Sequence, residues 1–73
     1  MAMLKVKADV TGSVWKILAP AGTKLGAGDT IMILESMKME IPVIAEDGGT
    51  VAQLHVAEGE SVNEGQLVAT LSE

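Results

Sequence analysis

The chain has 73 residues and a net charge of −5, with no cysteine and a single aromatic residue, Trp15. This length allows one domain with one small core, expected to span residues 1–73. The missing cysteines exclude disulfides, thiolate chemistry and cysteine-based metal sites, and the missing arginine, phenylalanine and tyrosine argue against nucleic-acid binding. No apolar run approaches a membrane span, and residues 1–5 alternate like a strand rather than a signal peptide. We therefore expect a soluble, cytoplasmic protein.

The chain contains an internal repeat with an offset of 37 residues. Three of the seven identities are glycines, which mark turns or close backbone approaches. The shared turn positions predict two copies of one β-unit related by a pseudo-two-fold axis. The identical pairs are Val6/Val43, Ala8/Ala45, Gly12/Gly49, Val14/Val51, Gly22/Gly59, Gly28/Gly65 and Leu34/Leu71.

Alternating apolar residues and β-branched residues predict four strands in each half and no helix. The expected strands are Leu4–Ala8, Ser13–Ala19, Thr23–Leu25, Thr30–Glu35, Met39–Ala45, Thr50–Ala57, Ser61–Val62 and Gln66–Leu71. Two such four-stranded layers packed face to face give an all-β sandwich or flattened barrel.

The repeat also predicts which side chains face the core. Because side chains alternate along a strand, every second residue is expected to face the core, Trp15 included, and the residues between these positions are expected to face solvent. The expected inward positions are Trp15, Ile17 and Ala19 with their equivalents Ala52, Leu54 and Val56; the expected outward positions are Lys16, Leu18, Gln53 and His55.

The junction between the halves falls at Met37–Lys38. A two-residue hairpin there would join Thr30–Glu35 to Met39–Ala45, and such hairpins favour type I′ turns with positive φ at both central residues. Met-Lys is a poor intrinsic choice for that turn. A poor local choice at an exposed tip indicates that function selected these residues.

The tip sequence Glu35-Ser36-Met37-Lys38-Met39 resembles the Glu-Ala-Met-Lys-Met hallmark of the biotinyl domain family, with Ser36 in the place of the commoner alanine. Two further steps of that family lie at Pro20–Leu25 and Glu58–Gly65, so the resemblance covers the whole chain. The two halves align without a gap and therefore lack the inserted thumb of some family members. The resemblance implies the biotinyl/lipoyl hammerhead, a flattened barrel-sandwich of two four-stranded antiparallel sheets.

The same resemblance implies a biotin carboxyl carrier. Biotin protein ligase would attach biotin to the amine of Lys38, and the base that generates the neutral amine would belong to the ligase. The biotin arm would then carry a carboxyl group between biotin carboxylase and carboxyltransferase, so the domain is a shuttle with no catalytic or metal-binding residue of its own. The tip residues Glu35, Ser36, Met37, Met39 and Glu40 would serve recognition.

Other readings remain open from the sequence. Lipoyl carriers of 2-oxoacid dehydrogenases or the glycine cleavage system share the fold but typically read Asp-Lys-Ala at the tip, and some hammerhead domains carry no cofactor. Met37 and Met39 could pack at the sandwich edge, and Glu35 and Glu40 could be solubilising charges. His55 has no second histidine or cysteine with which to hold a metal.

Overall fold

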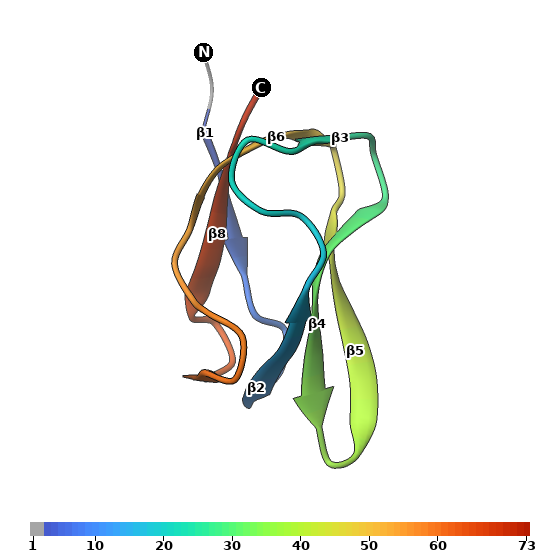
Figure 1. Ribbon diagram of the computed structural model, residues 1–73, viewed down its shortest axis with the longest axis vertical. Helices are drawn as coiled ribbons and strands as arrows, with labels where there is room; N and C mark the ends of the chain where they lie inside the picture. Colours follow the sequence, from blue (N-terminus) through green and yellow to red (C-terminus); the bar gives the residue numbers. More distant parts are fainter. Residues whose placement is uncertain (1–2) are drawn as a thin grey trace.

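A computed structural model describes residues 3–73, which form eight strands and no helix (Figure 1). All eight predicted strands are present, with ends that differ from the prediction by a few residues at most; Met1 and Ala2, the start of the predicted N-terminal strand pattern, lie outside the described residues. No helix able to cross a membrane occurs among residues 3–73. The strands are β1 (Met3–Lys7), β2 (Gly12–Ile17), β3 (Lys24–Leu25), β4 (Asp29–Ser36), β5 (Met39–Ala45), β6 (Gly49–Leu54), β7 (Ser61–Val62) and β8 (Leu67–Ser72).

The strands form two four-stranded antiparallel sheets, with the orders β1-β8-β6-β3 (sheet A) and β5-β4-β2-β7 (sheet B). Each sheet takes two strands from each half, so the expectation that each half makes one layer is wrong. The reason is the tight hairpin between the halves, which makes β4 and β5 neighbours in one sheet. Adding four to the strand numbers of the first half, and subtracting four in the second, turns one sheet order into the other. The pseudo-two-fold prediction is therefore confirmed.

Backbone hydrogen bonds outside the strands obey the same symmetry. The amide of Gly22 donates to the carbonyl of Val51 at 2.7 Å, and its equivalent, the amide of Gly59, donates to the carbonyl of Val14 at 2.7 Å. Gly28 and Gly65, which like Gly22 and Gly59 have positive φ, make the second matched pair: Gly28 donates to Ala45 and Gly65 to Ala8, both at 2.8 Å. The identities found in the sequence thus mark the turns that tie each half to the other.

The core between the sheets is aliphatic throughout, with no buried polar or charged side chain among the described residues. Its largest fully buried members come from both halves, and burial of such side chains stabilises the fold by roughly 25 cal/mol per Å². They are Ile31, Met32, Leu34, Leu71, Val14, Val51, Val62 and Val68.

Trp15 is not a core residue: half of its surface is exposed (50%). The cause is a β-bulge between Val14 and Lys16, where Trp15 and Lys16 together oppose Ile33 of β4. The extra residue shifts the alternation, so Val14 fills the core position that was predicted for Trp15.

The equivalent bulge lies between Val51 and Gln53, and it exposes Ala52 and buries Val51 in the same way. Beyond each bulge the predicted inward and outward positions are confirmed. Ala19 and Val56 are buried, Ile17 and Leu54 pack against the core, and the expected outward side chains, Lys16, Leu18, Gln53 and His55, are exposed.

Candidate functional site

The junction of the two halves is a two-residue hairpin that projects from one end of the molecule. Ser36 pairs with Met39 at the last position of the ladder, which leaves Met37 and Lys38 as the turn. Their φ angles are 53° and 65°, so the predicted turn with two positive φ values is confirmed. For residues other than glycine this left-handed backbone costs about 1–2 kcal/mol each. The strands below the tip must hold it in place.

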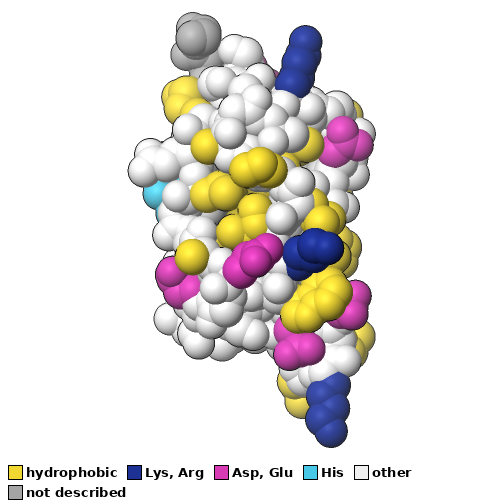
Figure 2. Space-filling view, in the orientation of Figure 1, with side chains coloured by type: hydrophobic (Ala, Val, Ile, Leu, Met, Phe, Trp, Pro, Cys, Tyr) yellow, Lys and Arg dark blue, Asp and Glu magenta, His cyan; other side chains and the backbone are white. Residues whose placement is uncertain are grey.

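The side chains of the tip point into solvent. Met37 is 92% exposed, Met39 is 63% exposed and Lys38 is exposed as well. The molecule measures 36 × 17 × 16 Å, and the hairpin lies at the end of its long axis opposite the start of β1 and the end of β8 (Figure 1). Figure 2 shows a lysine side chain as the outermost group at this end. An amine in this position is accessible to the active-site cleft of another protein.

One hydrogen bond holds the base of the hairpin against the turn between β1 and β2, and a second joins that turn to the turn between β7 and β8. The hydroxyl of Ser36 donates to the carbonyl of Thr11 at 2.9 Å, and the hydroxyl of Thr11 accepts from the amide of Glu64 at 3.0 Å. Gly12 lies so close to β4 that a Cβ atom there would come within 3.0 Å of the carbonyl oxygen of Glu35. Sequence reasoning did not find Thr11 or Gly12 as supports of the tip, although Gly12 was conspicuous as one of the repeated glycines.

All six residues singled out in the sequence lie in the turn and the last two pairs of the hairpin. Glu35 and Glu40 face each other in the register directly below the Ser36–Met39 pair, and both are exposed. Like charges at directly opposed positions of an antiparallel pair destabilise it. The tip is therefore an exposed lysine between two exposed methionines, above a pair of carboxylates.

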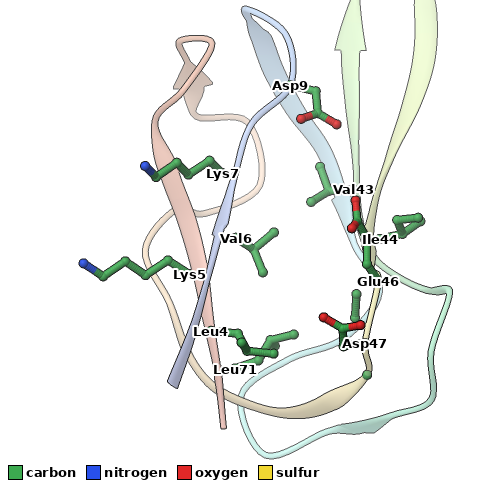
Figure 3. Close-up of a pocket in the computed structure, with 12 residues that line it drawn as sticks. Leu4, Lys5, Val6, Lys7, Asp9, Val43, Ile44, Glu46, Asp47 and Leu71 are labelled. Atoms are coloured by element: carbon green, nitrogen blue, oxygen red, sulfur yellow. The ribbon is translucent and has the colours of Figure 1, made fainter. Parts of the chain in front are cut away.

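A pocket of about 320 Å³ lies elsewhere, between β1 and the end of β5 (Figure 3). Leu4, Val6, Val43 and Leu71 lie around its interior, whereas the side chains of Lys5 and Lys7 point away from it. The residues that line it do not include any residue of the tip. The lysine is thus presented on a projection and not in a cavity.

The described residues contain no group of three or more side chains suited to hold a metal ion. His55 is exposed on sheet A, and its Nε2 atom shares a hydrogen bond with the hydroxyl of Thr70 at 2.7 Å. This pairing gives the single histidine a structural partner on the surface of the sheet.

Comparison with known proteins defines the class. The sequence matches the family described as "Biotin-requiring enzyme" over residues 7–71. It is 41% identical to the biotin/lipoyl attachment protein of Bacillus subtilis (strain 168) over 94% of each chain. It is 40% identical to the biotinylated protein TB7.3 homolog of Mycobacterium leprae over 92% of this chain and 94% of that protein.

Among solved structures, the urea carboxylase of Kluyveromyces lactis superposes with a TM-score of 0.92 at 33% identity. The match covers 99% of this chain and 6% of the carboxylase. The chain therefore belongs to the family of biotin/lipoyl attachment domains, as the resemblance of the tip predicted, and it has the hammerhead fold of that family.

Proposed function

We propose that this chain is a biotin carboxyl carrier and that Lys38 is the residue to which biotin is attached. One observation supports this proposal above all others: the lysine of the family motif is exposed on a two-residue turn of positive φ. The family match and the 40% identity to a biotinylated protein agree with it.

The site has the chemistry that attachment requires. The Nζ atom of Lys38 attacks the acyl carbon of an activated biotin, the activating adenylate leaves, and the amine proton goes to a base of the ligase. Because the side chain is exposed, conversion of the ammonium into an amide disrupts no packed contact. The tether from Ser36 to Thr11 keeps the turn in place while the reaction proceeds.

The domain itself is a substrate and a shuttle. Biotin, once attached, holds a carboxyl group, and the long lysine–biotin arm moves that group from a biotin carboxylase site to a carboxyltransferase site. Relatives that are parts of carboxylases support this role, among them the urea carboxylase of which the domain spans 6%. The cysteine-free composition suits a reducing compartment, and we propose the cytoplasm as the location.

A lipoyl carrier is the main alternative, because lipoyl domains share the fold. The tip favours biotin: Met37 and Met39 flank Lys38, where lipoyl domains typically have aspartate and alanine. The third reading, a hammerhead without cofactor, disagrees with an uninterrupted tip that displays the lysine.

Intact-mass spectrometry tests the proposal. The purified apo chain is incubated with biotin protein ligase, biotin and ATP, and in parallel with a lipoate ligase and lipoate. We expect a single biotin adduct that peptide sequencing assigns to Lys38, and no adduct on Lys38→Arg, which stays protonated and is a poor nucleophile. A label on Lys5, Lys7 or another lysine, or lipoate as the preferred adduct, contradicts the proposal.

A further inference from the structure

The pseudo-two-fold axis gives the two outer sheet faces the same backbone, and this permits an internal comparison. Five outward pairs at equivalent positions, 37 apart, are similarly exposed on the two faces: Trp15/Ala52, Leu18/His55, Ile33/Thr70, Pro42/Lys5 and Ile44/Lys7. A difference in chemistry between the faces is therefore not demanded by the fold.

The outer face of sheet B carries more apolar side chains than that of sheet A, and these surround one exposed cation, Lys16, which pairs with Ile33. The exposed positions of this face include Trp15 at 50%, Leu18 at 46% and Ile44 at 41%. Ile33 and Pro42 belong to the same face, because they alternate with core residues and pair with each other across β4 and β5. We define the apolar face as the residues Trp15, Leu18, Ile33, Pro42 and Ile44. Its equivalents on sheet A are Ala52, His55, Thr70, Lys5 and Lys7.

The contrast is sharpest at the bulges. Both halves form the same bulge with an exposed extra residue, which is Ala52 in sheet A and Trp15 in sheet B. Alanine at position 52 demonstrates that the bulge needs no large side chain. Likewise, His55 and Thr70 share a hydrogen bond on sheet A, whereas Leu18 and Ile33 occupy the same positions on sheet B. The single aromatic residue of the chain is thus half exposed at a position where the fold accepts alanine.

The apolar face lies on the same strands as the hairpin that displays Lys38. Strands β4 and β5 supply both, and Pro42 lies four residues from Lys38, about 13 Å along an extended strand. Figure 2 shows a hydrophobic side chain above the projecting hairpin, with acidic side chains beside it. Glu35 and Glu40 lie between the apolar face and the tip, so a partner that covers both must be basic opposite these carboxylates.

We propose that the apolar face is the docking surface for the biotin protein ligase, a deduction that rests on the proposed attachment at Lys38. The bare lysine is short, so the ligase must lie against the hairpin itself, whereas the finished biotin arm lets later enzymes stay farther away. A lysine alone also cannot distinguish this chain from other proteins, and an exposed tryptophan on the same sheet as the reacting lysine is the kind of residue that dominates binding energy. A stable dimer needs roughly 20–30 residues on each side, whereas a transient contact between an enzyme and its protein substrate can be smaller, so the size of this face suits the ligase better than a second copy.

The test replaces the apolar face with the residues that the chain already carries at the equivalent positions. The variant Trp15→Ala/Leu18→His/Ile33→Thr places alanine, histidine and threonine where sheet A has Ala52, His55 and Thr70. The matched control, Lys5→Ala/His55→Ala, alters the outer face of sheet A. Circular dichroism and thermal unfolding establish that both variants are folded, and the single Trp15→Ala variant serves if the triple variant is not.

The readout is steady-state biotinylation with purified ligase, biotin and ATP, with the apo chain as the varied substrate. We expect the triple variant to raise the KM for the apo chain about tenfold or more while kcat stays the same, and the control to change neither. An unchanged KM, or a loss confined to kcat, overturns the docking proposal. If the docking proposal fails in this way but the wild-type chain is still biotinylated at Lys38, the proposed function stands. Analytical ultracentrifugation should show that the wild-type chain is a monomer at the concentrations of the assay. A wild-type dimer that the triple variant abolishes would assign the apolar face to a second copy of the chain and would also overturn the proposal.

Discussion

Replacing Gly12 by alanine tests whether the close approach of β2 to β4 supports the tip. A Cβ atom at this position would lie within 3.0 Å of the carbonyl oxygen of Glu35, 3.1 Å from its carbonyl carbon and 3.2 Å from the Cβ of Ser36. Two of these three atoms are backbone, which cannot rotate away, so β2 and β4 must separate. Overpacking of this kind costs about 1–3 kcal/mol. For a domain of this size each kcal/mol lowers Tm by roughly 4–8 °C.

Gly26→Ala provides the matched control. The new Cβ there would meet only the carboxylate of Asp29 at 3.5 Å, an ordinary contact, and Gly26 is not among the glycines with positive φ. The control should therefore change the free energy of unfolding by no more than about 0.5 kcal/mol, or raise it slightly by restricting the unfolded chain. Urea denaturation followed by circular dichroism measures both variants. Equal stability of Gly12→Ala and wild type would refute the close approach and the support it gives to the hairpin.

Three further predictions concern the tip and the symmetry. The double variant Met37→Asp/Met39→Ala should keep its free energy of unfolding within about 0.5 kcal/mol, because both side chains are exposed, yet initial rates should show slower biotinylation; an unchanged rate means that position alone directs the ligase. Biotinylation should shift the NMR amide signals of residues 36–40 only, since the tip is remote from the core, and widespread shifts would mean that biotin docks on the domain. Val14→Ala and Val51→Ala should each cost about 2 kcal/mol in urea denaturation, and costs that differ by more than about 1 kcal/mol would show that the symmetric environments are not equivalent.

The repeat made most of the fold predictable. Glycines 37 residues apart located the turns, and alternation located the strands between them. The same repeat placed Lys38 at the midpoint, where a hairpin between the halves had to form. The turns and the central hairpin could be predicted because the residues that form a tight turn, or that pair across a hairpin, are close together in the sequence.

The bulges could not be predicted from alternation, because alternation assumes one residue per ladder position. Trp15 and Ala52 were assigned to the core for that reason, and they are exposed. A signal was present in the sequence: the core pair Val14/Val51 and the next apolar pair Ile17/Leu54 are three residues apart, and two residues of a regular strand on one face are separated by an even number. The supports of the tip at Thr11 and Gly12 depend on contacts between strands distant in sequence, which no local pattern encodes.

The strand order has a consequence for synthesis of the protein. Strand β1 has a single neighbour in its sheet, and that neighbour is β8, the last of the eight strands in sequence order. The motif around Lys38 is synthesised before β8, but the sheet that covers Val14 and Leu34 closes only when residues up to Ser72 are available. Such non-local pairing slows folding. We therefore expect a chain cut before β8 to contain the motif around Lys38 without the folded sheets that support the hairpin.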